Sequence, residues 1–146
     1  MARPQPRPLD RIQALPSWLS GRVAARGRAH LTEAIAKEDL NLAHLAVLAA
    51  AAQDAPLAQA DLVRRLAIDA KDMVLLINHL EHLGHVVRDP DPRDRRKNVI
   101  RVTPQGTAAL NRCLKEAERV NAELLAPLED EERRQLLELL GRVLDE

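Results

Sequence analysis

The segment VVRDPDPRDRRKNVIRVTPQG, residues 86–106, constrains the fold most. Two short runs rich in β-branched residues, 86–88 and 99–102, flank a polar stretch, which predicts a β-hairpin with a long charged tip. Pro90 and Pro92 lack the N–H that a strand ladder needs, so they open the loop and stiffen it. Strands this short are not stable alone, so the hairpin must pack against helices.

The rest of the chain has the composition of a helical protein. Hydrophobic residues make up 46% of the 146 residues, yet there is one Trp and no Phe or Tyr, so Leu, Ala and Val dominate. Ala and Leu are among the best helix formers. Apolar residues recur at helical spacing in six segments. We expect helices over about 16–37, 42–53, 57–68, 70–83, 104–125 and 129–144. The predicted fold class is therefore mainly α with a small β-hairpin.

Two of these helices, 57–68 and 70–83, are joined by a short turn. Asp69 stands where an N-cap is needed, and Gly84 is placed to end the second helix as the residue after its C-cap. Two helices connected in this way predict a helix-turn-helix, in which the second helix is offered to the major groove of DNA.

The helix after Pro104 is long for a small domain. Thr103 is a good N-cap for it, and about 22 residues span roughly 33 Å, more than a winged domain covers. Its apolar stripe, and that of the helix 129–144, therefore needs another partner. A second copy of the chain is the simplest one.

The charge is zero overall but unevenly distributed. Residues 1–30 carry six Arg and one Asp, a balance of +5, whereas residues 115–146 carry five basic and ten acidic residues, a balance of −5. Such a chain offers a basic surface to a polyanion while staying neutral. The single Cys113 excludes a disulfide framework, and no apolar run is long enough to span a membrane. We expect a cytoplasmic protein with no membrane partner and no cofactor.

Taken together, these features resemble the MarR family of bacterial transcription regulators. The matching pieces are DLVRRLAIDAKDMVLLINHLEHLG, residues 61–84, and DPDPRDRRKNVIRVTPQG, residues 89–106. Asp-Arg-Arg at 94–96 and Thr-Pro-Gln-Gly at 103–106 follow the family's wing pattern. LPSWLSGRVAARGRAHL, residues 15–31, is similar to the first helix of an actinobacterial branch.

The resemblance implies a winged helix-turn-helix domain in an obligate homodimer. Residues 1–14 show no helical periodicity and are expected to form a flexible arm, while 15–146 form a single domain. In that domain 38–104 would be the DNA-binding lobe, and 15–37 with 105–146 the dimerisation helices. The recognition helices would enter successive major grooves of a pseudo-palindromic operator, with each wing in an adjacent minor groove. Many members bind a small, often aromatic effector between the two lobes, which weakens operator binding.

The basic tip of the hairpin is the first candidate for DNA contact. Arginine at such a tip suits the narrow, electronegative minor groove of A·T-rich DNA. We assign this role to Arg93, Arg95, Arg96 and Lys97. Asp94 is expected to pair with a neighbouring Arg and so hold the loop. The alternative is a solvated charge cluster neutralised by the nearby Asp residues.

The recognition helix departs from the family, in which many members place Ser, Thr and Arg. Its candidate contacts are Lys71, Asp72, Val74, Leu75 and Asn78. Asp72 caps the helix or accepts from a cytosine amino group, whereas Val74 and Leu75 can meet thymine methyls. Asn78 reads adenine or holds a phosphate. Because these residues offer few hydrogen bonds to base edges, we expect recognition of DNA shape by the wing to contribute more to specificity.

Several other polar residues have two interpretations each. Arg64 and Arg65, on the outer face of the preceding helix, clamp phosphates or are solvated. His79, His82 and His85 are spaced three apart, but no acid or thiol is placed to complete a metal site with them. For His79 we favour a phosphate contact or plain surface over a metal site.

A ligand pocket is a further hypothesis. Trp18, Arg22 and His44 together would border a site for an aromatic acid, although Trp18 is expected in the interface core and His44 in the core or facing a partner. Cys113 is expected to be a buried structural thiol.

The leading hypothesis is a homodimeric, sequence-specific DNA-binding transcription regulator, a repressor relieved by a small ligand. A dimeric protein-interaction module of the same fold with little specific DNA binding is the first alternative, and a metal-responsive regulator is the second. An enzyme is not expected, because the chain lacks a Gly-rich phosphate loop, any Tyr, and a Cys/His ligand pattern of useful spacing.

Overall fold

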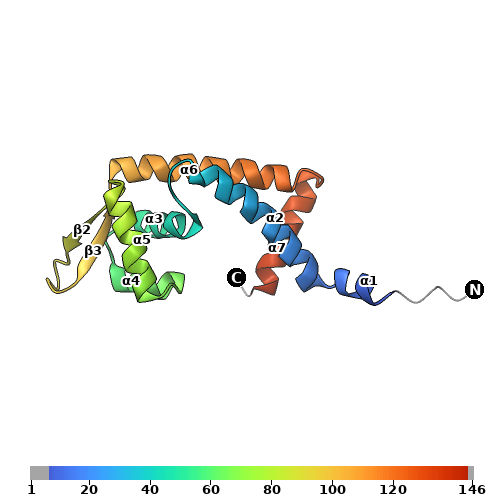
Figure 1. The fold of residues 1–146 in the computed structure, drawn as a ribbon, viewed down its shortest axis with the longest axis horizontal. Helices are drawn as coiled ribbons and strands as arrows, with labels where there is room; N and C mark the ends of the chain where they lie inside the picture. Colours follow the sequence, from blue (N-terminus) through green and yellow to red (C-terminus); the bar gives the residue numbers. More distant parts are fainter. Residues whose placement is uncertain (1–6, 145–146) are drawn as a thin grey trace, which may run out of the picture. The chain divides into compact units, whose positions relative to one another are not determined.

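The computed structural model describes residues 7–144 and is mainly helical, with one small sheet. This confirms the predicted fold class. The elements in chain order (Figure 1) are α1 Pro8–Gln13, α2 Pro16–Ala36, α3 Leu42–Gln53, β1 Leu57–Ala58, α4 Gln59–Leu66, α5 Ala70–His82, β2 Val86–Pro90, β3 Asn98–Val102, α6 Pro104–Leu124 and α7 Asp130–Val143.

The chain divides into two compact units. The first, Thr32–Ala117, contains the helix-turn-helix and the sheet; we call it the winged unit. The second combines the chain up to Leu31 with the chain from Glu118 onward; we call it the terminal unit. The boundaries between the units fall inside α2 and α6.

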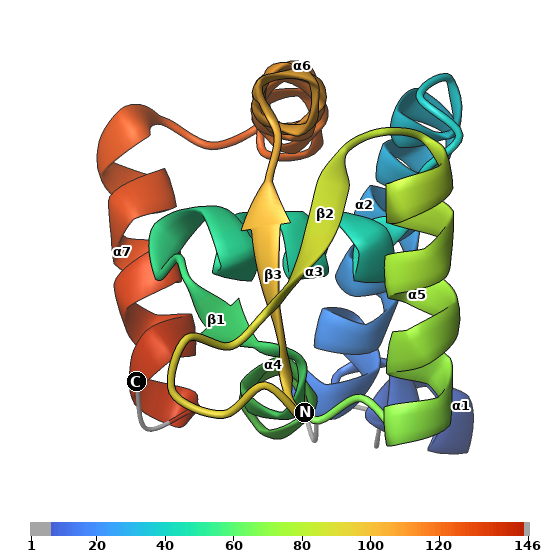
Figure 2. The same ribbon diagram turned by 90° about the vertical axis from the view of Figure 1, so that its left-hand side faces the viewer.

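The sheet of the winged unit has three antiparallel strands in the order β1-β3-β2, as Figure 2 shows. The β2–β3 hairpin is paired from Val86 opposite Val102 to Pro90 opposite Asn98, so the strand run ends where the first proline removes a donor. The hairpin packs against α3 and α5, because strands this short are not stable alone. The fully buried side chains of this core include Val47, Leu48, Leu62, Met73, Ile77, Leu80 and Ile100.

The first strand, β1, corrects the expectation that a helix begins at residue 57. Leu57 and Ala58 instead pair with Ile100 and Val99, and α4 begins at Gln59. Ala58 has an extended backbone (φ −68°, ψ 146°) and makes no side-chain cap. The free edge of β3 offers backbone partners to this extended dipeptide, and only the tertiary structure reveals that edge.

The turn residues have the predicted local roles. The Asp69 carboxylate accepts from the Lys71 N–H at 2.8 Å and so caps α5. Ala67, in the turn after α4, has a left-handed backbone with φ 50°. Gly84, after the C-cap of α5, has φ 76°, a conformation that favours glycine. Thr103 Oγ1 accepts from the Gly106 N–H at 3.0 Å, as an N-cap of α6 does.

The terminal unit leaves most of its apolar side chains exposed. α7 has no buried residue, and Leu137 is 63% exposed. Among the described part of the expected flexible arm, residues 8–13 form the short helix α1, while residues 1–6 lie outside the described residues. The last two residues of the expected dimerisation helices, 145–146, also lie outside them. None of the helices within residues 7–144 combines the length and hydropathy that crossing a bilayer requires.

Candidate nucleic-acid interface

The loop that connects β2 to β3, residues 91–97, is closed by backbone hydrogen bonds. The Asp91 N–H donates to the Lys97 carbonyl at 2.8 Å, and the Lys97 N–H donates to the Asp94 carbonyl at 2.9 Å. The Asp91 carboxylate also accepts from the Arg93 N–H at 2.8 Å. These contacts give the charged tip a defined shape, which a purely solvated cluster would not need.

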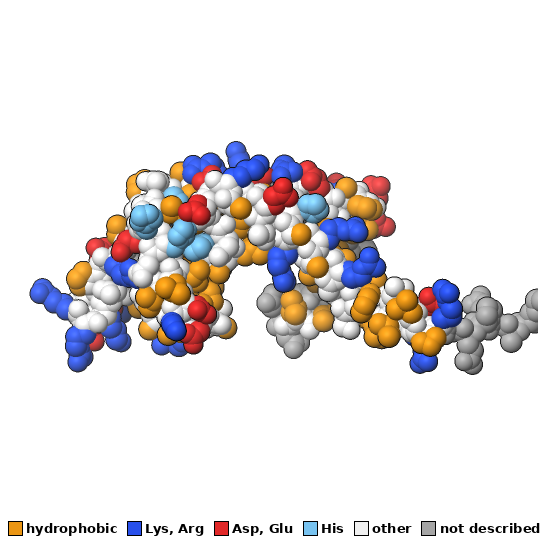
Figure 3. Space-filling model, viewed as in Figure 1, with side chains coloured by type: hydrophobic (Ala, Val, Ile, Leu, Met, Phe, Trp, Pro, Cys, Tyr) orange, Lys and Arg blue, Asp and Glu red, His pale blue; other side chains and the backbone are white. Residues whose placement is uncertain are grey.

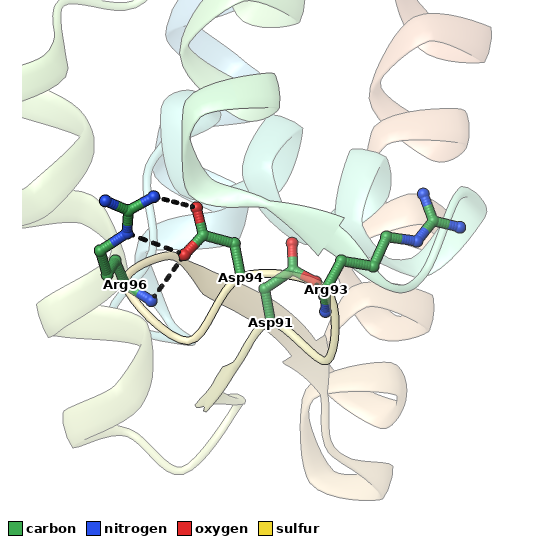
Figure 4. Close-up of polar contacts among 4 residues, drawn as sticks. All are labelled: Asp91, Arg93, Asp94 and Arg96. Carbon is green, nitrogen blue, oxygen red and sulfur yellow. Dashed lines mark hydrogen bonds and ion pairs between the residues drawn. The ribbon is translucent and has the colours of Figure 1, made fainter.

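Asp94 pairs with Arg96, the arrangement expected of it (Figure 4). One carboxylate oxygen accepts from both the Arg96 N–H and Nε, each at 3.1 Å, and the other from Nη2 at 3.4 Å. The Arg96 side-chain hydrogen bond, followed by its backbone hydrogen bond, holds the pKa of Asp94 below its usual value. Asp94 therefore stays ionised and keeps the Arg96 backbone in place.

The remaining cations of the tip face solvent. Among the described residues, the side chains of Arg93, Arg95 and Lys97 make no hydrogen bond or ion pair, and all three are exposed. Figure 4 shows the Arg93 side chain extending away from the Asp94–Arg96 pair. In Figure 3, Lys and Arg side chains gather at this end of the hairpin. Arg96 is itself 90% exposed, so its pairing leaves the guanidinium accessible.

The exposed face of α5 contains all five residues predicted for base contact: Lys71, Asp72, Val74, Leu75 and Asn78. The opposite face is anchored by Met73, Ile77 and Leu80, which are fully buried. Leu75 is 61% exposed, and Val74 is 39% exposed. The side chains most suited to a thymine methyl thus face outward.

Asn78 is tied to the sheet. Arg88 of β2 donates from Nη2 to Asn78 Oδ1 at 2.7 Å and from Nη1 to Glu81 Oε1 at 3.2 Å. The Arg88 side chain is 19% exposed, whereas both of its partners on α5 are exposed. Sequence reasoning missed Arg88, because its partners lie seven and ten residues away in a different element.

The winged unit is similar to known proteins in both sequence and structure. The model of the MarR family matches residues 38–97, the segment that contains the helix-turn-helix and the hairpin tip. The crystal structure of wild-type MarR from E. coli, in its apo form, superposes with a TM-score of 0.77, at 25% identity, over 89% of this chain and 97% of that one. The chain therefore has the MarR-type winged-helix fold.

Proteins related in sequence include curated transcription regulators that are 30–37% identical to this chain over 82–90 residues. The matched segments cover only 49–57% of those regulators, so the chain spans about half the length of the curated relatives it matches. One is the transcriptional repressor NicR from Pseudomonas putida, 30% identical over 62% of this chain and 57% of NicR. The structure of BpsR from Bordetella bronchiseptica, whose DNA binding is regulated by 6-hydroxynicotinic acid, is 26% identical (TM-score 0.79) and covers 92% of this chain and 96% of BpsR.

Two arginines predicted to touch phosphates are engaged in ion pairs. Arg64 pairs with Asp61 in the same helix, and Arg65 pairs with Asp54. Arg64 is 74% exposed and Arg65 44%, so both guanidinium groups remain open to solvent. A phosphate would compete with one carboxylate for each of them.

His79 lies against the start of α3. Its Nε2 is 2.7 Å from the Asp39 carbonyl oxygen, and its ring is 4.6 Å from that of His44, centroid to centroid. His44 Nδ1 accepts from the Asn41 N–H at 3.0 Å, which closes a capping box on α3. Burial, followed by the nearby His79, lowers the pKa of His44. A phosphate contact through His79 Nε2 would have to replace the Asp39 contact.

A cavity of about 690 Å³ lies beside these histidines in the winged unit. Its lining includes Asp72, Leu75, Leu76 and His79 of α5, together with His44. Of the residues predicted for a ligand pocket, His44 is at this cavity, whereas Trp18 and Arg22 belong to the terminal unit and are exposed.

The other histidines have separate surroundings. His82 is exposed at the end of α5, whereas His85 is 5% exposed and its Nδ1 has no hydrogen-bond partner among the described residues. Across residues 7–144 no group of three or more His, Cys, Asp or Glu side chains is arranged to hold a metal ion. Cys113 is buried, as expected of a structural thiol. Burial raises the pKa of this thiol, which makes the reactive thiolate less accessible.

Proposed function

We propose that the protein is a homodimeric, sequence-specific DNA-binding transcription regulator, a repressor relieved by a small ligand. The observation that supports it most is the hairpin tip: a loop held in shape by its own aspartates that leaves Arg93, Arg95 and Lys97 exposed and, within residues 7–144, unpaired. Exposed arginines on an ordered finger are suited to a narrow minor groove. The finger belongs to the segment that matches the MarR family model.

The homodimer is supported by the apolar surface of the terminal unit. In α1, α2 and α7 and the residues beside them, many large apolar side chains are exposed in the single chain; they include Leu9, Ile12, Leu15, Trp18, Leu19, Val23, Leu137, Leu139, Leu140, Val143 and Leu144. Soluble monomers rarely expose so many large apolar side chains on adjacent stretches of chain. A second copy would cover them, and a twofold dimer predicts a pseudo-palindromic operator. A repressor of this kind would work in the cytoplasm, where the bacterial chromosome lies.

Ligand control is supported by the cavity beside His44. Three of its lining residues, Asp72, Leu75 and His79, are also candidates for DNA contact on α5. A small aromatic acid in this cavity would therefore occupy groups that the operator needs. The regulation of BpsR by an aromatic acid and the repressor activity in the name of NicR favour the same interpretation.

Selection of bound fragments from the source genome, followed by fluorescence anisotropy on the selected duplex, tests the proposal. A specific regulator is expected to bind the selected duplex about 10³-fold or more tightly than random duplex DNA at physiological salt. Equal affinity for both, from a folded dimer, would contradict sequence-specific regulation and favour the protein-interaction module. The aromatic acid is then titrated into the complex, and release of the duplex is expected.

A further inference from the structure

The cavity beside His44 and His79 has a lining without permanent positive charge. Its lining includes the carboxylates of Asp69 and Asp72, and within residues 7–144 no lysine or arginine lines it. An anion that enters this cavity is repelled by the carboxylates. A carboxylate ligand therefore needs a group in the lining that becomes positively charged, and histidine is the side chain whose charge changes near neutral pH.

His44 cannot supply that charge without the loss of a helix cap. Its Nδ1 accepts from the Asn41 N–H at 3.0 Å, so the single lone pair of this nitrogen is occupied and the ring proton lies on Nε2. A proton added to Nδ1 would place two donors against each other and break the capping box of α3. Burial, followed by the nearby His79, lowers the pKa of His44, which also favours the neutral ring.

His79 has a nitrogen that is free to take up a proton. Its Nε2 is 2.7 Å from the Asp39 carbonyl oxygen, and because a carbonyl only accepts, Nε2 carries the ring proton. Among the described residues Nδ1 of His79 makes no hydrogen bond, so a second proton can be added there without breaking a contact. The side chain is 32% exposed, so solvent can deliver that proton.

The titratable groups around His79 are the carboxylates of Asp39, Asp69 and Asp72 and the imidazoles of His44 and His85. Asp39 Oδ2 lies 3.6 Å from His79 Nε2, a separation at which a carboxylate favours the protonated imidazole. Burial is the largest cause that lowers the pKa of His85, as it is for His44, so both of those rings are neutral near pH 7. The surroundings of His79 thus oppose an anion but tolerate a cation.

We propose that His79 is the residue of this cavity that binds the carboxylate of an aromatic acid, and that it takes up one proton when the acid binds. The proposal rests on the proposed function, since it names how the cavity recognises the ligand that releases the operator. The acid enters ionised, solvent supplies one proton to His79 Nδ1, and the two opposite charges pair. Because the complex then holds more protons than the free protein, affinity for the acid increases as pH falls, until His79 of the free protein is itself charged.

Isothermal titration calorimetry of benzoate into the full chain, without DNA, tests the proposal. Benzoate is a simple aromatic carboxylate that stays ionised from about pH 6 to pH 8. Titrations in buffers of different ionisation enthalpy give the number of protons taken up on binding. We expect roughly half a proton or more per chain at about pH 7.5, and an affinity that falls about fivefold from pH 7 to pH 8. Benzamide has the same ring without the charge, and it is expected to cause no proton uptake.

Three variants locate the proton. His79→Gln keeps a side-chain N–H that can donate to the Asp39 carbonyl but cannot be protonated, so proton uptake and the pH dependence of affinity are expected to be lost. His44→Asn supplies another acceptor for the Asn41 N–H and is expected to retain proton uptake. His82→Gln, at an exposed histidine of α5 outside the cavity lining, is the control and should retain uptake as well.

A fourth variant keeps the proposal testable if His79→Gln does not fold, as judged by circular dichroism. Asp39→Asn keeps the backbone carbonyl, and asparagine tolerates the left-handed backbone at this position (φ 57°). It removes the carboxylate 3.6 Å from His79 Nε2, so protonation becomes less favourable and the decline of benzoate affinity is expected to move to lower pH. An unchanged pH profile in the folded Asp39→Asn variant would contradict the proposal.

The outcomes separate this inference from the proposed function. If benzoate neither binds the protein between about pH 6 and pH 8 nor releases the selected duplex, control by an aromatic acid fails and the inference fails with it. Benzoate binding without proton uptake overturns the inference alone, because ligand control is then intact. Proton uptake that persists in the folded His79→Gln variant places the proton on another group and overturns the assignment to His79.

Discussion

Arg112 of α6 holds Glu38 with two parallel hydrogen bonds, from Nε to Oε1 at 2.6 Å and from Nη2 to Oε2 at 2.9 Å. Glu38 lies between α2 and α3, 74 residues earlier in the chain. The pair therefore connects the start of the winged unit to its last helix. The hydrogen bond from Arg112 is the main reason why the pKa of Glu38 lies below its usual value.

Substitution of this glutamate predicts a pH-dependent loss of stability. Because the pKa of Glu38 is lowered by folding, its contribution is fully present above the ordinary value of 4.5 and is lost as pH falls through the folded pKa. Glu38→Gln is expected to lower the thermal midpoint at pH 7 by less than about 5 °C, since the pair is partly exposed. The difference from the wild-type protein should shrink below about pH 4, and a constant difference from neutral pH to about pH 3 would contradict the assigned cause.

Substitution of Gly106 is expected to destabilise the protein more than substitution of Glu38. A Cβ at this position would lie 2.0 Å from the His85 carbonyl oxygen, a separation that atoms cannot adopt, and that carbonyl already accepts from the Thr103 N–H at 3.0 Å. Gly106→Ala must shift backbone, so we expect it to reduce the free energy of unfolding by about 3 kcal/mol. Urea denaturation followed by circular dichroism measures the change.

Gly21 provides the matched control for that substitution. It lies in α2, and a Cβ there would meet nothing within 4 Å. Gly21→Ala is expected to be neutral or to stabilise by about 0.5–1 kcal/mol, because alanine is the better helix former. Equal losses in both variants would show that close approach to His85 is not what requires glycine at 106.

Local signals in the sequence were sufficient for most of the helices, but not for α1, which forms in a stretch expected to be a flexible arm. The prolines, the Asp69 cap and Gly84 placed the ends of α3 and α5 within a residue or so, because caps and turn residues act on their immediate neighbours. β1 was missed because two extended residues carry no periodic signal and form a strand only where β3 offers a free edge.

The site was predictable in part for the same reason. The Asp94–Arg96 pair spans two residues and was expected from the sequence. The Arg88–Asn78 and Arg112–Glu38 contacts join separate elements, so no local pattern indicates them. The contact between His79 and Asp39 joins residues 40 apart, and no local pattern indicates the left-handed backbone of Asp39 (φ 57°).

The exposed leucines of α7 predict that the dimer depends on this helix. Leu137 is 63% exposed in the single chain, so a charged residue there costs little until a partner covers it. Leu137→Glu is expected to shift the protein from twice 16.3 kDa toward 16.3 kDa in sedimentation equilibrium, while each chain stays folded. Val87→Glu, at a 43% exposed residue of β2, is the control and should leave the mass unchanged. A wild-type protein that sediments as a monomer at micromolar concentration would refute the dimer.

The exposed cations of the hairpin tip predict the salt dependence of DNA binding. Each phosphate neutralised by a protein cation contributes about 0.9 to the slope of log K against log salt concentration. Arg95→Ala removes one such cation from each of two chains, so the slope should become shallower by about 1.8, and affinity at low salt should fall about tenfold or more. Anisotropy titrations between about 50 and 300 mM salt, concentrations chosen to span the physiological range, measure the slope.

Two controls separate charge, shape and position in that experiment. Arg95→Lys keeps the charge and should retain the slope, while losing some affinity for A·T-rich operators because an ammonium group suits the narrow minor groove less well than a guanidinium. Lys115→Ala removes an exposed cation of α6, away from the hairpin, and should leave the slope nearly unchanged. If Lys115→Ala and Arg95→Ala lower the slope equally, the protein binds DNA through its overall distribution of charge, and the hairpin tip makes no specific contribution to binding.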